Sequence, residues 1–145
     1  MEKIIASGKR KRAVARAILM KGSGKVTINK KNYEFLQLFD KLKIQEPLRI
    51  AKEILGKIDF DIFISARGGG EKGQVEAARL ALARAIVKFS KSMAESKDFS
   101  KEKPKELEEA YFDYDKTLVV ADIRRKEPNK PGDSKARSKR QSSKR

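Results

Sequence analysis

The segment of this sequence best suited to chemistry is a glycine-rich stretch, RGGGEKGQ, at residues 67–74. It precedes the longest helical pattern of the chain. Glycines let a backbone approach a ligand closely, and the free N–H groups at the start of a helix attract phosphate oxygens. The segment therefore indicates a phosphate-binding loop, which an RNA backbone would satisfy. A tight turn without any ligand is the alternative interpretation.

Two nucleotide-binding motifs match this segment only in part. Its glycines satisfy G-x-G-x-x-G, but a dinucleotide site also requires a strand that ends in an acidic residue about 20 positions later. Met93 and Ala94 occupy that place, at the end of the helical pattern. A P-loop needs Lys and then Ser or Thr after its last glycine, whereas this chain has Gln74 and Val75. A nucleotide-using enzyme stays an alternative that a mononucleotide titration would detect.

The sequence contains no histidine and no cysteine. Histidine is the commonest general base and metal ligand, and a disulfide, a zinc cluster or a thiol nucleophile would need cysteine. Most hydrolase and metalloenzyme mechanisms therefore lack their usual groups, and we expect a protein that is not an enzyme and has no cofactor. No apolar run approaches the roughly 20 residues that cross a bilayer, so no membrane partner is expected.

Two carboxylates, Asp59 and Asp61, share one face of a predicted strand at residues 58–66. Paired carboxylates can perform acid/base chemistry or bind a metal. No histidine and no further acidic residue lies nearby in the sequence, so we interpret the pair as the solvated face of a strand.

Positive charge is concentrated at the two ends of the chain. The sequence has 36 basic and 20 acidic side chains and a net charge of +16. Residues 1–31 carry ten basic and one acidic side chain, residues 124–145 carry ten basic and two acidic, and the 92 residues between them have a net charge of −1. Blocks of like charge repel one another, so they indicate a polyanionic partner. A chromatin-type architectural protein would share these ends, but it would not require the glycine loop.

A β-hairpin over residues 10–29 is predicted to carry the N-terminal cations. Residues 12–20 alternate with period two, and Gly22-Ser23-Gly24 supplies a turn before a second strand at residues 26–28. Arg12 and Arg16 share one side of the first strand with aliphatic residues. They either contact phosphate or pack their stems at a sheet edge with the charged ends in water, and the pattern favours neither.

Four helices are predicted, at residues 33–39, 47–55, 75–89 and 101–112. Pro47 suits the first turn of the second helix. The third has a buried apolar side, alanines that permit close packing on a sheet, and cations that face mostly outward, namely Arg79, Arg84, Lys88 and Lys91. The fourth is acidic, and the aromatic residues near its end are expected to dock onto the body rather than stack on bases: Tyr111, Phe112 and Tyr114.

Residues 122–145 are predicted to form an extended basic tail on a globular domain of residues 1–121. The tail has prolines, a glycine and no large apolar residue after Ile123, so it cannot fold alone. Fully extended, its last 22 residues would span on the order of 70 Å, enough to thread between RNA helices. A generic polybasic tail is the alternative.

Four blocks of this sequence, in order, resemble the small-subunit ribosomal protein S nine family: SGKRKRAVARA, GSGKVTIN, RGGGEKGQVEAARLALARAIV and RRKEPNKPGDSKARSKRQSSKR. The segments KIQEPLRIA and YDKTLVVADIRR resemble its archaeal and eukaryotic branch. Two positions depart from the family pattern. The chain ends Ser-Lys-Arg, as in bacterial members, where the archaeal branch typically shows Tyr-Arg, and Lys30 stands where the family has glycine.

The resemblance implies an α+β fold like domain two of ribosomal protein S five. In that fold a mixed sheet is covered on one side by helices and contains a left-handed βαβ crossover. The resemblance also implies a place in the head of the small ribosomal subunit in the cytoplasm. There the body would bind small-subunit ribosomal RNA beside neighbouring head proteins, and the tail would contact the anticodon stem-loop of the P-site tRNA.

Candidate binding residues combine this resemblance with the charge pattern and the glycine loop. The residues expected to contact ribosomal RNA are Lys9, Arg10, Lys11, Arg12, Arg16, Arg67, Gly68, Gly69, Gly70, Lys72, Gln74, Arg79, Arg124, Arg125, Lys130, Lys135 and Arg137. By their position in the family motif, Lys144 and Arg145 are expected to contact the tRNA, and Lys139 and Arg140 are expected to line the approach.

Overall fold

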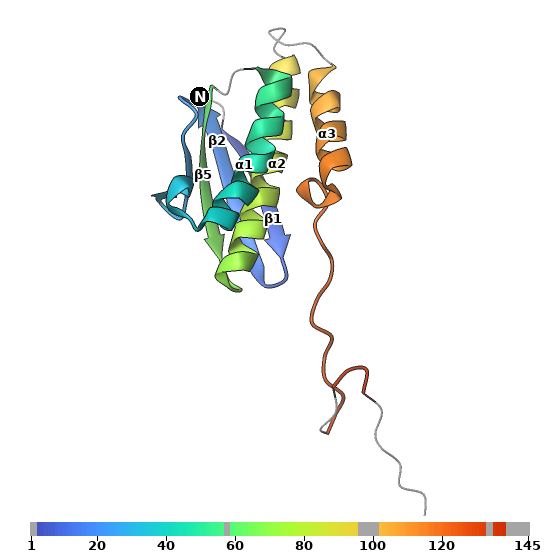
Figure 1. Ribbon diagram of the computed structural model, residues 1–145. Helices are drawn as coiled ribbons and strands as arrows, with labels where there is room; N and C mark the ends of the chain where they lie inside the picture. The colour runs from blue at the N-terminus through green and yellow to red at the C-terminus, as the bar shows by residue number, and fades with distance from the viewer. Residues whose placement is uncertain (1–2, 57–58, 96–101, 133–134, 139–145) are drawn as a thin grey trace, which may run out of the picture.

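Strands on one side and helices on the other form two layers in this computed structural model, which describes residues 3–56, 59–95, 102–132 and 135–138 (Figure 1). The strands are β1 (Ile4–Arg10), β2 (Ala13–Lys21), β3 (Val26–Ile28), β4 (Lys31–Asn32) and β5 (Phe60–Arg67). The helices are α1 (Leu38–Leu55), α2 (Glu71–Glu95) and α3 (Lys103–Tyr114), with 3₁₀ turns η1 (Tyr33–Phe35) and η2 (Lys116–Leu118). The predicted α+β class is confirmed.

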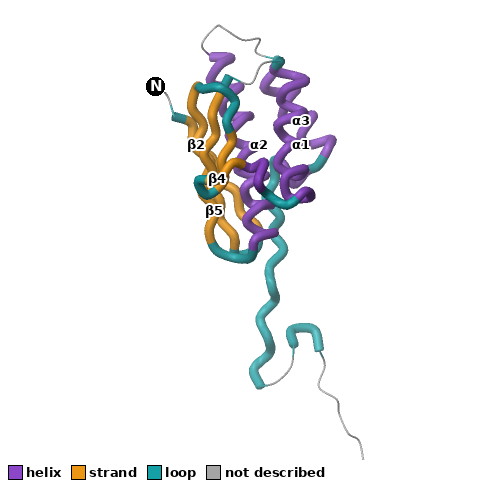
Figure 2. The backbone as a smooth tube through the Cα atoms, turned by 60° about the vertical axis from the view of Figure 1, so that its left-hand side comes forward, coloured by secondary structure: helices purple, strands orange, loops and turns teal. Residues whose placement is uncertain are grey.

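The five strands form one mixed sheet in the order β1-β2-β5-β3-β4. β1 pairs with β2, β2 with β5, and β3 with β4 in antiparallel fashion, whereas β3 and β5 are parallel and are connected through α1. The helices cover one face of this sheet, and the other face has no covering element among the described residues (Figure 2).

Period-two alternation and small side chains explain the close packing of the two layers. Ala13, Ala15, Ala17 and Leu19 of β2 all point inward and are fully buried. Five alanines of α2 are fully buried as predicted: Ala77, Ala78, Ala81, Ala83 and Ala85. At the closest approach, a Cβ added to Gly8 of β1 would lie 2.2 Å from the Ala77 carbonyl oxygen, so glycine is required there.

The predicted hairpin over residues 10–29 is wrong. β2 and β3 are not neighbours, because β5 lies between them and pairs with β2 from Val14↔Arg67 to Lys21↔Phe60. β5 has a strand on each side, and its inward residues Phe60, Ile62 and Ile64 are buried. Burial of this face fixes the register of β5 against its neighbours. The hairpin present in the structure joins β1 to β2 through Lys11 and Arg12. The N-terminal strand β1 was not predicted.

A single helix, α1, replaces most of the two short helices that were predicted. Residues 33–35 form only a 3₁₀ turn, and Pro47 lies in the middle of α1 rather than in a first turn. Proline in a helix interior removes one backbone hydrogen bond, so local propensity argues against this position. Tertiary contacts outweigh that cost, because Pro47 is buried and its carbonyl oxygen accepts a hydrogen bond of 2.7 Å from the Tyr111 hydroxyl.

α3 docks on α1 and α2 largely through its predicted apolar side. Leu107 and Tyr111 are fully buried, and burial raises the pKa of the Tyr111 hydroxyl well above its usual value. The docking prediction is confirmed for Tyr111, whereas Phe112 and Tyr114 are about half exposed.

Of the two carboxylates of the predicted strand, Asp61 lies in β5 and has a structural role. Asp61 accepts hydrogen bonds from the backbone N–H groups of Ser23 and Lys25 at 2.9 and 2.8 Å, and so holds the turn between β2 and β3. The hydrogen bond from Lys25 is the main cause that lowers the pKa of Asp61. Asp59 is exposed, and Ile58, the first residue of the predicted strand, lies outside the described residues.

Candidate nucleic-acid interface

Cations from three distant parts of the chain converge around one pocket of about 740 Å³. The turn between β1 and β2, the start of α2 and the first part of the tail supply its walls. Six of the lining residues are basic and two are acidic, which makes the pocket electropositive. The lining residues are Arg10, Lys11, Arg12, Gly69, Gly70, Lys72, Gly73, Glu76, Arg125, Lys126, Glu127, Pro128 and Asn129.

The glycine loop is packed against the turn that presents Lys11 and Arg12. Gly68 and Gly69 have φ angles of 74° and 63°, a region that favours glycine. A Cβ on Gly68 would lie 2.8 Å from the Arg12 carbonyl oxygen. The tight-turn interpretation therefore accounts for these two glycines, and it also explains how the loop and the basic turn come together.

Gly70 and the first turn of α2 form the open part of the loop. A Cβ on Gly70 would meet no atom within 4 Å, so a ligand backbone can approach there. The Gln74 side chain donates a 3.2 Å hydrogen bond to the Gly68 carbonyl oxygen and so bridges the loop to α2. Lys72 lines the pocket but also pairs with the buried Asp40 at 2.7 Å.

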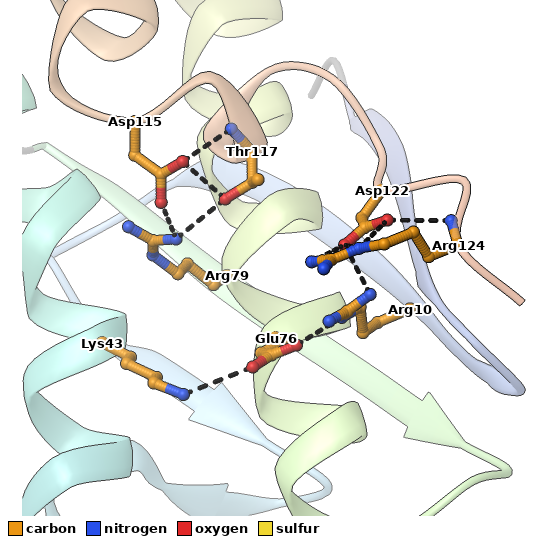
Figure 3. A network of polar contacts seen from close by, with 8 residues as sticks. All are labelled: Arg10, Lys43, Glu76, Arg79, Asp115, Thr117, Asp122 and Arg124. Atoms are coloured by element: carbon orange, nitrogen blue, oxygen red, sulfur yellow. Dashed lines mark hydrogen bonds and ion pairs between the residues drawn. The ribbon is translucent and has the colours of Figure 1, made fainter.

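Arg10, which lines the pocket, is the centre of a polar network (Figure 3). Its guanidinium donates to Glu76 and to Asp122, each at 2.6 Å, and only 20% of its side chain is exposed. Partial burial raises the pKa of Glu76, but Arg10 and Lys43 outweigh that effect and the pKa lies below its usual value. Arg10 thus joins β1, α2 and the start of the tail.

Asp122 accepts hydrogen bonds from Arg124 as well as from Arg10. The Arg124 side chain donates to the Asp122 carboxylate at 2.7 and 2.9 Å, and the Arg124 backbone N–H donates at 2.8 Å. The Arg124 side chain is the main cause that lowers the pKa of Asp122 far below its usual value. The first residues of the tail are therefore attached to the body.

Arg79 does not face outward as the sequence suggested. Its guanidinium pairs with Asp115 at 2.7 Å and with Glu46 at 2.5 Å, and 13% of its side chain is exposed. Arg84 likewise donates to the backbone carbonyl oxygens of Val119 and Ser7. The segment after α3 crosses this side of α2 and partly buries both arginines, whereas Lys88 and Lys91 are exposed as predicted.

The acidic partners Glu76, Asp115 and Asp122 were not recognised as site residues. Arg10 lies 66 residues from Glu76 and 112 residues from Asp122 in the sequence. No local pattern connects positions so far apart, so only an observed contact identifies them.

The uncovered face of the sheet continues the basic surface from the pocket. Lys9 of β1 and Arg67 of β5 flank Val14 of β2 in one cross-strand row, and Arg16 lies in a row nearby. Lys9, Arg16 and Arg67 are all exposed. Their charged ends are thus available to a ligand. For Arg16, both predicted interpretations, phosphate contact and packing of the aliphatic stem on the sheet, are consistent with this exposure.

Beyond Asp122 the described part of the tail has no helix or strand and extends away from the two layers (Figure 1). Arg125 lines the pocket, Arg137 pairs with Glu127, and Lys130 donates to the Ser138 carbonyl oxygen. Lys135 is exposed. The four residues expected to meet tRNA lie outside the described residues: Lys139, Arg140, Lys144 and Arg145.

Within the described residues, no group of three or more acidic side chains is arranged to hold a metal ion. None of the helices described is both long and apolar enough to cross a membrane.

Comparisons with known proteins place this sequence in a family. A family described as "Ribosomal protein S9/S16" matches residues 8–145. The chain is 43% identical over 146 positions to the "Small ribosomal subunit protein uS9" of Methanococcus vannielii, with 99% of this chain and 98% of the relative covered. It is 44% identical over 141 positions to the protein of the same description from Thermoplasma acidophilum, with 97% and 98% covered. The chain belongs to the ribosomal protein S9/S16 family, and it is therefore a structural protein of the small ribosomal subunit and not an enzyme.

Proposed function

We propose that this chain binds small-subunit ribosomal RNA through a basic surface centred on the pocket between the β1–β2 turn, the glycine loop and the start of the tail. The observation that carries the proposal is the convergence of Lys11, Arg12, Lys72, Arg125 and Lys126 from three distant segments around that pocket. Grouping like charges costs self-repulsion, which an RNA phosphate backbone relieves.

The residues of this surface divide into two groups by their contacts. Arg12, Arg16 and Arg67 are exposed, and they are available for direct phosphate contact together with Lys9 and Lys11. Arg10 and Arg79 already bind carboxylates of the body, so any phosphate would have to share their guanidinium groups. We therefore assign the direct contacts to the first group, and retain Arg10 and Arg79 as weaker contacts that mainly position the surface.

The tail extends the proposal to tRNA. The body would comprise residues 1–121 and the tail residues 122–145. Attachment of Asp122 to Arg10 of the body gives the tail a fixed origin, from which its basic end would reach the anticodon stem-loop of the P-site tRNA. Lys144 and Arg145 would make the contact, as the family resemblance implies.

The family also implies a setting. We place the protein in the head of the subunit, in the cytoplasm, beside other head proteins. We expect its fold to be that of domain two of ribosomal protein S five, in which the β3–α1–β5 crossover would be left-handed.

Replacing cations that line the pocket tests the RNA-binding surface. Arg12→Ala/Lys126→Ala removes two pocket cations for which no ion pair is present in the described part of the chain. The affinity for small-subunit ribosomal RNA should fall. The slope of log K against log salt should become shallower by roughly 0.7–0.9 for each phosphate that the variant no longer neutralises.

Lys52→Ala/Lys105→Ala is the matched control, because both lysines are exposed on helices and neither lines the pocket. Its salt slope should equal that of the unmodified chain. An equal decrease in affinity for the two double variants would show that net charge, and not this surface, determines binding.

Deletion of residues 141–145 tests the tail separately. The shortened chain should still assemble into small subunits, because the body is intact, but P-site tRNA should dissociate faster from those subunits. Unchanged tRNA retention would refute the tail assignment without affecting the RNA-binding surface.

A further inference from the structure

Four large apolar side chains are exposed together at the start of α1. Phe35 is 85% exposed, Leu38 66%, Phe39 75% and Leu42 40%. Their spacing of three, four and seven residues places them on one side of η1 and the first turns of α1. We refer to these four residues as the apolar stripe.

The apolar stripe is a contiguous patch of large side chains. Together they expose on the order of 500 Å² of apolar surface, the size of the largest patch on a typical monomer, which is often functional. None of them belongs to the core, which this helix contacts through Ile44, Pro47 and Ala51 on its opposite side. Burial of the stripe on another molecule would be favourable because it removes this area from water.

The backbone beneath the apolar stripe is held in place. Asn32 caps η1 by accepting a hydrogen bond from the Glu34 N–H, and Leu36 packs against the core. Lys72 of α2 donates to Gln37 at 2.9 Å and to Asp40 at 2.7 Å. The stripe is therefore preformed, and a partner would not have to order it.

Three cations and one carboxylate, the exposed Glu34 of η1, lie around the apolar stripe. Lys31 precedes it on β4, Lys41 lies beside Leu38 and Leu42 on α1, and Arg49 continues the same side of the helix. No ion pair is present for these three side chains in the described part of the chain. A surface that offers carboxylates around an apolar centre would complement this arrangement.

RNA is the less suitable occupant. Bases can stack on the phenylalanines, but the two leucines offer no aromatic face, and phosphates would have to lie close to apolar surface. A second copy of this chain would bring another net charge of +16 and the same cationic surroundings. Both considerations favour an acidic protein.

We propose that the apolar stripe is the docking site for an acidic segment of another protein of the small subunit. That segment inserts apolar side chains between Phe35, Phe39 and Leu42, and its carboxylates pair with Lys31, Lys41 and Arg49. The inference rests on the proposed function, because the partner is sought in the assembled subunit.

Photo-crosslinking in purified small subunits tests the proposal. A tagged chain carrying benzoylphenylalanine in place of Phe39 is expressed in cells, the subunits are isolated and irradiated, and the linked molecule is sequenced. We expect a link to a protein segment with aspartate or glutamate next to apolar residues. Lys41→Glu should lower the yield several-fold, whereas Lys52→Glu, which changes a lysine farther along the same helix, should leave it unchanged.

Benzoylphenylalanine at Phe112, an exposed aromatic residue of α3, controls for proximity without docking. A link from position 39 to RNA, no link at all, or a protein link insensitive to Lys41→Glu would overturn the docking site alone. Absence of the tagged chain from small subunits would overturn the docking site and the proposed function together.

Discussion

Single charged residues determine how the tail begins. Arg10 was expected to face RNA, yet its guanidinium bridges Glu76 on α2 and Asp122 at the start of the tail. Asp122 in turn binds the Arg124 side chain and backbone. Only 13% of the Asp122 side chain is exposed. Because Asp122 binds Arg10 of the body and Arg124 of the tail, it is the residue through which the body sets the direction of the tail.

Asp122→Asn should release the start of the tail without unfolding the body. The neutral amide cannot form an ion pair with Arg10, and the Arg124 side chain becomes free to enter a protease. We expect trypsin to cleave after Arg124 several-fold faster, whereas cleavage after Arg137, which is paired with Glu127, stays the same. Asp113→Asn on the surface of α3 is the control, and equal cleavage rates in the two variants would contradict the attachment.

Lys30 occupies a backbone conformation that favours glycine. Asn29 and Lys30 form the two-residue turn between β3 and β4, with φ angles of 48° and 67°. Lys30→Gly should raise the free energy of unfolding by about 0.5 kcal/mol, because relief of the left-handed strain exceeds the entropy that glycine adds to the unfolded chain. Urea denaturation measures this, and Lys30→Ala, which keeps a Cβ, should give no gain.

At the scale of elements, the contact between β1 and α2 brings the two layers together. Gly8 faces α2 across a backbone approach that leaves no room for a methyl group, since an added Cβ would also lie 2.7 Å from the Ala81 nitrogen. The position of α2 in turn places the glycine loop beside the β1–β2 turn. The pocket therefore depends on a glycine that does not line it.

Gly8→Ala should lower the free energy of unfolding by about 1–3 kcal/mol, as expected when a core is overpacked. Gly70→Ala is the matched control, because the added methyl group meets no atom within 4 Å and φ at Gly70 is not positive. Thermal unfolding of both variants distinguishes them. A Gly8 variant as stable as the Gly70 variant would mean that α2 can shift away from β1 without cost.

At the scale of the whole molecule, ion pairs connect segments that the backbone leaves far apart. Asp115 pairs with Arg79, and Glu76 with Arg10 and Lys43. Partial burial raises the pKa of Asp115, but the hydrogen bonds from Arg79 and Thr117 outweigh it, and the pKa lies below its usual value. Both carboxyl groups are ionised in the folded protein at neutral pH.

The free energy of unfolding should be nearly constant between about pH 5 and 8 and should fall below about pH 4. No histidine titrates in the upper range. A carboxyl group with a lowered pKa binds fewer protons when folded than when unfolded, so its contribution is present above the unfolded pKa and disappears as the pH falls. Asp115→Asn should make the decrease in acid shallower, which urea denaturation across this pH range would show. An unchanged acid slope would contradict this role of Asp115.

The sequence by itself determined much of what this protein is. Alternation in residues 12–20 predicted a strand there, the apolar periodicity of residues 75–89 predicted the inner face of α2, and the absence of histidine and cysteine pointed away from enzymes. The ordered motifs indicated the family and the structural, small-subunit role, both of which are confirmed. These features were predictable because side-chain periodicity and residue chemistry are local properties.

The tertiary structure alone decided which segments are neighbours. β5, and not β3, pairs with β2. Pro47 lies inside α1, where its carbonyl oxygen binds Tyr111 of α3. Arg10 and Arg79 bind carboxylates of the protein instead of facing solvent. Local patterns cannot specify these outcomes, because each depends on the free energy of contacts between residues that lie tens of positions apart. The convergence of the cations on one pocket is such an outcome, since it follows from how the strands and helices pack.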